Sequence, residues 1–179
     1  EIYQCDWSSD VCSSDLPEAV EFLESIDVQM YKIASATSAL KHKFALETIR
    51  EISKIKKQVF ISTGFGGKKK LVNMKLVGKN ILYTYCIAKY PALDKNIIWK
   101  DILNYDFFSD HTLGYTIPLT YAILKSPLKN KEIFIEKHVK LNSSIGPDAP
   151  FSITFDELSN LCRDIKRVEL LKLPDIKLA

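Results

Sequence analysis

Residues 106–112, DFFSDHT, carry the pattern that decides the fold, a short apolar and aromatic run that ends in polar and titratable groups. Residues 133–138, IFIEKH, repeat this pattern further along the chain. Runs of this length suit parallel strands buried on both faces. The two stretches therefore predict consecutive strands whose ends carry side chains able to do chemistry.

Other parts of the sequence follow the same plan. Strands are expected at residues 28–34, 59–62, 80–86, 106–109 and 133–136, and helices at 18–26, 38–55, 68–77, 97–104, 117–124 and 154–171. This alternation predicts an α/β fold with a parallel sheet. Periodicity alone fits an open sheet or a (β/α)₈ barrel. Polar groups at the end of every strand favour part of a TIM barrel, with about five βα units present.

Composition narrows the classes of partner. The 179 residues are 46% hydrophobic with a net charge of +3, and the single tight basic run, residues 68–70, has no interleaved aromatic residues. Nucleic-acid binding is therefore not expected. No apolar run reaches the roughly 18 residues that span a bilayer, so we expect no membrane partner and a cytoplasmic location.

Residues 1–16, EIYQCDWSSDVCSSDL, differ from the rest of the chain. They contain four acids and no Lys or Arg, and they lack any helical or strand period. Residues 6–16 also resemble the translation of a common sequencing-library adapter. We interpret residues 1–16 as a non-native segment and residues 17–179 as the part that carries the fold.

Two histidines stand at corresponding places after consecutive strands. Neighbouring strands lie about 4.8 Å apart, and alternation puts Ser109 with His111, and Glu136 with His138, on one face. Two inward imidazoles at one level can share a cation. A lone histidine at a strand end is more often a hydrogen-bonded structural residue, and both readings remain open for the pair.

Three other residues suggest an anion pocket. Lys32 lies in an apolar strand, where an uncompensated ammonium is costly to bury, and Ser35 and Ser62 follow neighbouring strands. Together they could bind a phosphate, although Lys32 could also extend to solvent. Tyr90 and Asp148 stand in loops after strands, where Asp148 could accept hydrogen bonds from a sugar or act as a base. A simple turn is the alternative for the Gly146-Pro147-Asp148 stretch.

Several motifs together resemble the sialic acid synthase family. The resemblance covers residues 17–171 and rests on YKIAS (31–35), ISTG (61–64), Tyr90-Pro91, SDHTLG (109–114), EKH (136–138) and GPDAPFS (146–152). It implies a transferase, a TIM-barrel N-acetylneuraminate synthase or a related nonulosonic acid synthase. Such enzymes condense phosphoenolpyruvate with N-acetylmannosamine or a diacetamido trideoxy sugar.

The resemblance also implies roles for individual residues. Lys32, Ser35, Ser62 and Ser109 would bind phosphoenolpyruvate, and His111 with His138 would bind Mn²⁺ or Mg²⁺. Tyr90 and Asp148 would orient the sugar as catalytic residues. The parent protein would be a domain-swapped homodimer.

Some features depart from the family pattern. Thr37 stands where the family has an acid that contacts the sugar, and Ala88 replaces a common polar residue. The first barrel strands and a C-terminal antifreeze-like domain are expected outside this chain, so we expect the 179-residue chain itself to be inactive. Two alternatives stay open, namely another phosphoenolpyruvate-aldehyde condensing barrel and a non-catalytic remnant that binds sugar or phosphate.

Overall fold

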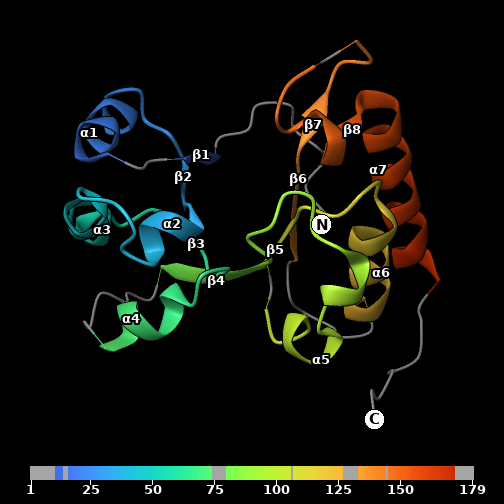
Figure 1. The fold of residues 1–179 in the computed structure, drawn as a ribbon, viewed down its shortest axis with the longest axis horizontal. Coiled ribbons are helices and arrows are strands. Elements are labelled where there is room, and N and C mark those ends of the chain that lie inside the picture. The colour runs from blue at the N-terminus through green and yellow to red at the C-terminus, as the bar shows by residue number, and fades with distance from the viewer. Residues whose placement is uncertain are drawn as a thin grey trace. The chain divides into compact units, whose positions relative to one another are not determined.

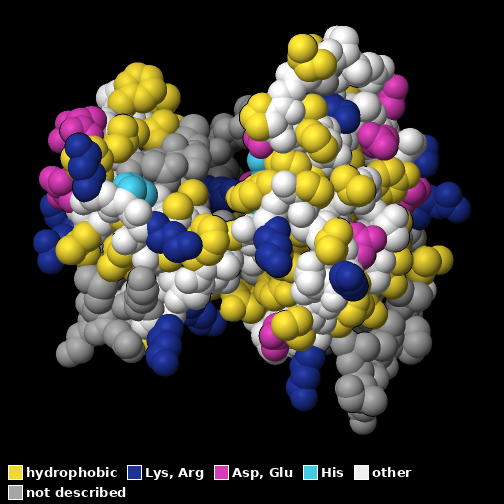
Figure 2. Space-filling model, in the orientation of Figure 1, with side chains coloured by type: hydrophobic (Ala, Val, Ile, Leu, Met, Phe, Trp, Pro, Cys, Tyr) yellow, Lys and Arg dark blue, Asp and Glu magenta, His cyan; other side chains and the backbone are white. Residues whose placement is uncertain are grey.

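The computed structural model describes residues 11–13, 16–73, 80–105, 107–126, 133–143 and 145–171. The chain divides between Cys86 and Ile87 into two compact units, and each is described by itself. No helix within the described ranges is long and apolar enough to cross a membrane. On the face seen in Figure 2, the lysine and arginine side chains are scattered rather than gathered in one basic patch.

The first unit contains a parallel sheet whose strands follow one another in chain order. Its helices lie along one side of the strands in Figure 1. The strands are β1 (Val11–Ser13), β2 (Met30–Ile33), β3 (Gln58–Ser62) and β4 (Ile81–Cys86). The helices are α1 (Pro17–Ser25), α2 (Ser35–Ser38), α3 (Ala45–Lys54) and α4 (Gly67–Asn73).

Alternation along these strands separates a face that packs against the helices from a face that carries several polar side chains. Ile33 pairs in register with Ile61, and both belong to the hydrophobic core that the helices cover. Ser62 pairs with Thr84 and points to the opposite face, because successive residues of a strand alternate. Lys32 also lies on this opposite face. The apolar residues of the first face therefore hold the helices, and the opposite face combines Lys32 and Ser62 with the buried ring of Phe60.

Within its described residues, the second unit contains two pairs of parallel strands and three α-helices. Strand β5 (Phe107–Asp110) pairs with β6 (Phe134–Lys137), and β7 (Val139–Lys140) pairs with β8 (Ile153–Thr154). The helices are α5 (Trp99–Ile102), α6 (Thr116–Lys125) and α7 (Phe155–Leu170), with 3₁₀ turns η1 (Asp94–Asn96) and η2 (Ala149–Phe151). Helix α7 begins with a capping box, in which the Thr154 and Glu157 side chains each bond the other's backbone N–H.

The parallel α/β alternation expected from the sequence is confirmed, and the five expected strands coincide with β2 to β6 within a few residues. The helix expected at residues 38–55 is wrong as one element, because the chain forms α2 and α3 instead. Between them Leu40 takes a positive φ of 56°, which a continuous helix excludes. Residues 74–77 of another expected helix, and Asp106, lie outside the described residues.

Residues 1–10 and 14–15 also lie outside the described residues. Val11–Ser13 pair with β2 as strand β1. The interpretation of residues 1–16 as a non-native segment remains a prediction.

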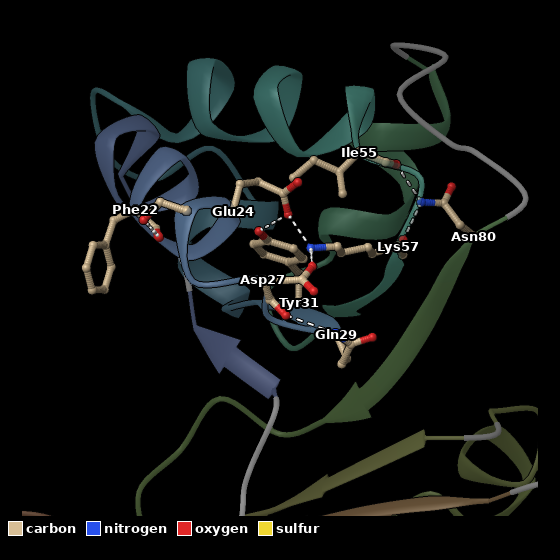
Figure 3. A network of polar contacts seen from close by, with 9 residues as sticks. Phe22, Glu24, Asp27, Gln29, Tyr31, Ile55, Lys57 and Asn80 are labelled. Carbon is tan, nitrogen blue, oxygen red and sulfur yellow. Dashed lines mark hydrogen bonds and ion pairs between the residues drawn. The ribbon is translucent and has the colours of Figure 1, made fainter.

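An ion-pair network ties α1 to the loop before β3 (Figure 3). Lys57 Nζ lies 3.0 Å from Glu24 Oε1 and 2.9 Å from Asp27 Oδ1, and the Tyr31 hydroxyl donates to Glu24 Oε1 over 2.5 Å. The Tyr31 hydroxyl, and then Lys57, hold the pKa of Glu24 below its ordinary value. This network lies around the start of β2 and just before β3, at the opposite ends of these strands from Ser35 and Ser62.

Candidate functional site

His111 and His138 come together because their strands are paired in register. Ser109 lies opposite Glu136 and Asp110 opposite Lys137, so the residues that follow them leave the sheet at the same level. The centroids of the two imidazole rings are 5.4 Å apart. The expectation that the two rings are neighbours is confirmed, and the metal role remains a proposal.

One hydrogen bond fixes the orientation of the His111 ring. Its Nδ1 lies 2.9 Å from the carbonyl oxygen of Ile87, and since a carbonyl only accepts, Nδ1–H is the donor. In the neutral ring Nε2 then carries the lone pair. Nε2 lies 3.5 Å from the Ser109 hydroxyl, at the outer limit of a hydrogen bond. This arrangement is common among metal-binding histidines, whose second nitrogen is held by a carbonyl or a carboxylate.

His138 has a carboxylate and an aromatic ring beside it. Its Nδ1 lies 3.7 Å from Asp148 Oδ2, close enough for an ion pair when the ring is protonated. The Phe151 ring meets the His138 ring edge to face, with centroids 4.9 Å apart. Phe151 is buried, whereas Asp148 is exposed. Asp148 can therefore reach both the histidine and a molecule in solvent.

Two loops are held against the histidines by backbone hydrogen bonds. Ala92 N–H donates to the carbonyl of His111 over 2.8 Å, and Ile153 N–H donates to that of His138 over 2.9 Å. The first bond fixes the loop that contains Tyr90, whose ring centroid is 4.3 Å from that of His111. The peptide bond between Tyr90 and Pro91 is cis. Exposed Tyr90 thus borders the His111 side of the histidine pair, in a loop that follows β4, and its role with a sugar remains a proposal.

The histidine pair fits a divalent ion with open positions. Each ring can offer one nitrogen, and a metal–nitrogen bond is roughly 2 Å long, so an ion fits between rings at this separation. Across the parts of the chain that the structure describes, no group of three or more His, Cys, Asp or Glu side chains could hold a metal. Any ion here would therefore take further ligands from substrate or water.

Polar side chains of the first unit lie together near the ends of β2, β3 and β4. They are the hydroxyls of Ser35, Ser62 and Thr84, which we call the hydroxyl cluster, and the thiol of Cys86 beside them. Ser35 Oγ accepts the backbone N–H of Gly64 over 3.1 Å and lies 3.0 Å from Cys86 Sγ. The hydroxyls of Ser62 and Thr84 are buried without a hydrogen-bond partner within the described residues. Buried hydroxyls without partners are costly, so they mark a place where a polar ligand or water would bind.

The side chain of Thr37 is engaged in a local hydrogen bond. Its side chain is buried on α2, and its Oγ1 lies 3.0 Å from Nε2 of His42. The structure therefore gives this threonine a local partner at the position where the family has an acid.

Four residues with a clear place in these clusters were missed by the sequence analysis. Asp110 and Lys137 form a buried ion pair, with Oδ2 and Nζ 2.7 Å apart. Phe151 packs on the histidines, and Thr84 contributes a buried hydroxyl. The one available signal for Asp110 and Lys137 was that opposite charges directly precede the two histidines.

Comparison with known proteins identifies the family to which the chain belongs. The model of the NeuB family matches residues 10–173, which is most of the chain. The chain belongs to the NeuB family. The resemblance to sialic acid synthases is thereby confirmed at the level of the family.

Two curated relatives of this NeuB-family chain carry the names of acid synthases. Pseudaminic acid synthase of Campylobacter jejuni is 29% identical over 165 residues, which are 85% of this chain and 45% of the relative. N,N'-diacetyllegionaminic acid synthase of the same species is 28% identical over 167 residues, with 85% and 47% covered. The chain therefore spans about half the length of the curated relatives it matches.

Solved structures show the same fold. An N-acetylneuraminic acid synthetase from Leptospira borgpetersenii superposes with a TM-score of 0.67 at 22% identity, covering 89% of this chain and 57% of that one. A spore coat polysaccharide biosynthesis protein from Bacillus subtilis gives 0.69 at 20% identity, with 93% and 48% covered. The chain thus shares its fold with about half of each of these proteins.

Proposed function

We propose that the protein to which this chain belongs condenses phosphoenolpyruvate with the open-chain aldehyde of an N-acylated amino sugar, giving a nonulosonic acid and phosphate. Membership in the NeuB family and the names of the relatives support this reaction. The observation that carries it in the structure is the His111–His138 pair, with the Nδ1–H of His111 held by the Ile87 carbonyl.

A divalent ion, Mn²⁺ or Mg²⁺, bound by His111 and His138 would polarise the sugar aldehyde as a Lewis acid. Ser109 lies beside His111, at the mouth of the same pair of strands, and its hydroxyl would donate to phosphoenolpyruvate. Asp148 and Tyr90 would hold the sugar by its hydroxyl groups, which contributes through proximity more than through proton transfer.

The hydroxyl cluster would bind the anionic part of phosphoenolpyruvate. Ser35 and Ser62 offer hydroxyls, and Lys32 lies on the same face as Ser62 and would supply the positive charge. Hydrogen bonds between such donors and phosphate oxygens are charge-assisted and stronger than neutral ones. The buried hydroxyl of Ser62, which lacks a described partner, supports this assignment.

The amino sugar is proposed to be a diacetamido trideoxy sugar, because the curated relatives are named for pseudaminic and diacetyllegionaminic acid. N-acetylmannosamine is the alternative. We also propose that the whole protein forms a closed barrel, works in the cytoplasm and acts as a domain-swapped homodimer.

The test for the 179-residue chain is binding of phosphoenolpyruvate, measured by calorimetry with Mn²⁺ and with a chelator. We expect tighter binding with Mn²⁺, and a further gain with a diacetamido trideoxy sugar but not with N-acetylmannosamine. An affinity for phosphoenolpyruvate that changes neither with Mn²⁺ nor with the sugar would contradict the proposed function.

Turnover provides a second readout, the phosphate released from phosphoenolpyruvate in the presence of Mn²⁺ and either sugar. We expect none from the 179-residue chain. Binding without turnover also fits a remnant that binds phosphate, which the loss of the family acid at Thr37 favours. Turnover by the full-length protein distinguishes a synthase from such a remnant. If the full-length protein also releases no phosphate, the remnant is the correct interpretation.

A further inference from the structure

A buried ion pair joins the ends of the two strands that carry the histidines. Asp110 and Lys137 are partners in register, their Oδ2 and Nζ atoms are 2.7 Å apart, and their side chains are 0% and 2% exposed. An ion pair so deeply buried adds little net stability, because desolvation of both charges offsets their attraction. Its presence therefore needs an explanation other than stability.

The ion pair is closed into a network by Thr112. The Asp110 Oδ1 atom accepts the backbone N–H of Thr112 over 3.1 Å and its hydroxyl over 2.9 Å. Lys137 Nζ also donates to the backbone carbonyl of Thr112. His111 stands between two residues of this network, and His138 directly follows a third. The backbone on both sides of one histidine, and before the other, is thus fixed by the same contacts.

The network lies on the other face of the strands from the histidines. Phe108, which shares a face with Asp110, packs against Tyr121 of α6 with ring centroids 5.4 Å apart. Alternation turns the side chains of His111 and His138 away from this helix side. Asp110 and Lys137 therefore act on any ligand of the histidines through the backbone.

We propose that Asp110, Lys137 and Thr112 form a positioning network, which sets the spacing of His111 and His138 for a divalent ion. This inference rests on the proposed function, because it requires the histidines to be metal ligands. Residues that orient metal-binding histidines typically change metal affinity by about 10- to 100-fold when they are altered. Such a change in metal affinity comes from the altered positions of the histidines, so it can be measured separately from a change in the stability of the fold.

The test compares Mn²⁺ affinity with melting temperature in the double variant Asp110→Leu/Lys137→Met. Replacing the ion pair itself by an apolar pair of similar volume costs little, but the buried N–H and hydroxyl of Thr112 lose their acceptor, so we expect a folded protein whose melting temperature is several degrees below that of the parent. Mn²⁺ affinity, measured from free Mn²⁺ by electron paramagnetic resonance, should fall about tenfold or more. A folded double variant with unchanged Mn²⁺ affinity overturns the inference.

Lys125→Met is the matched control. Lys125 is a buried lysine of the same unit, its Nζ donates to the Leu103 carbonyl over 3.2 Å, and the described contacts do not link it to either histidine. This variant should lose stability and keep its Mn²⁺ affinity. An equal loss of Mn²⁺ affinity here would show that general loosening, and not the network, is responsible.

Thr112→Val decides the question if the double variant does not fold. It keeps the ion pair and the side-chain shape but removes one hydrogen bond to Asp110, so Mn²⁺ affinity should fall about fivefold. Unchanged affinity overturns the inference. If the unaltered chain binds no Mn²⁺, the metal site of the proposed function fails as well. If His111→Ala abolishes binding while the network variants retain it, only the network inference fails.

Discussion

Two buried serines of the first unit differ in whether the protein satisfies their hydroxyl groups. Ser38 Oγ donates to the carbonyl of Ser62 over 2.6 Å, whereas the hydroxyl of Ser62 itself is buried without a described partner. A buried polar group without a partner costs free energy of folding, and its removal can be neutral or stabilising. Such a residue is suited to binding a ligand at the expense of stability.

We expect Ser62→Ala to leave the free energy of unfolding unchanged or slightly higher. Its affinity for phosphoenolpyruvate should fall about tenfold or more, because a hydrogen bond to a charged ligand is lost. Calorimetry and urea unfolding measure the two effects.

Ser38→Ala is the matched control for this prediction. The substitution removes a satisfied hydroxyl and leaves a carbonyl with one donor fewer, so it should cost roughly 1 kcal/mol of stability. If Ser62→Ala destabilises the protein by as much as Ser38→Ala, the view of Ser62 as an unsatisfied ligand group is wrong.

The sequence predicted the neighbourhood of the histidines well. Alternation along two strands and a common register were enough to place His111 beside His138. The sequence could not identify Asp110 and Lys137 as partners, because a charged residue next to a strand end is usually solvated. Phe151 was missed for a different reason: it packs on His138 only because the loop folds back through the Ile153–His138 hydrogen bond.

At the scale of elements, α2 and α4 approach each other unusually closely. A Cβ atom added to Gly67 would lie 2.3 Å from Ser38 Oγ and 2.7 Å from the Ser38 carbonyl oxygen. Backbone atoms cannot move aside easily, so glycine is required at the start of α4. The local pattern of residues 38–55 contains no sign of this contact. It also gives no sign of the positive φ of Leu40, and for that reason it read as one long helix.

Gly67→Ala should destabilise the first unit by about 1–3 kcal/mol, because the added methyl group overpacks the contact with Ser38. Urea unfolding provides the measurement, with Lys69→Ala as a control. Lys69 is exposed on the same helix, and its substitution should change stability by no more than about 0.5 kcal/mol. A gain of stability in Gly67→Ala, as Gly→Ala gives at unstrained positions, would contradict the close approach.

At the scale of the whole molecule, the ion-pair network of Figure 3 makes stability depend on pH. Tyr31 and Lys57 lower the pKa of Glu24 from 4.5, and Lys57 lowers that of Asp27 from 3.8. A carboxyl group whose pKa is lower in the folded protein than in the unfolded chain stabilises the fold at pH values above its unfolded-state pKa. This stabilisation is lost as the pH falls through its folded-state pKa. Asp27, and then Glu24, raise the pKa of Lys57, so its contribution is lost as the pH rises through the folded pKa.

We therefore expect the melting temperature to fall as the pH drops below about 4.5, the ordinary pKa of Glu24. Lys57→Met should lose part of this acid dependence, because both carboxylates lose their ammonium partner. Melting curves at a series of pH values measure the difference. An identical pH profile for the variant and the parent would rule out the network as the source.

At the scale of the whole chain, local sequence patterns predicted the strands but not the closure of a barrel. Short apolar runs with polar ends were enough to predict parallel strands, because both faces of such strands are buried and their ends gather at one edge. Closure into a complete barrel could not be predicted from such patterns, because it depends on the number, tilt and stagger of all the strands together.

The central claim is that His111 and His138 together bind a divalent ion, and titration of Mn²⁺ into the double variant His111→Ala/His138→Ala tests it most directly. His42→Ala serves as the control, because this histidine bonds Thr37 and belongs to the other unit. We predict that Mn²⁺ affinity falls at least about 100-fold in the double variant and stays unchanged in the control. Equal Mn²⁺ affinity in the parent and the double variant would contradict the account.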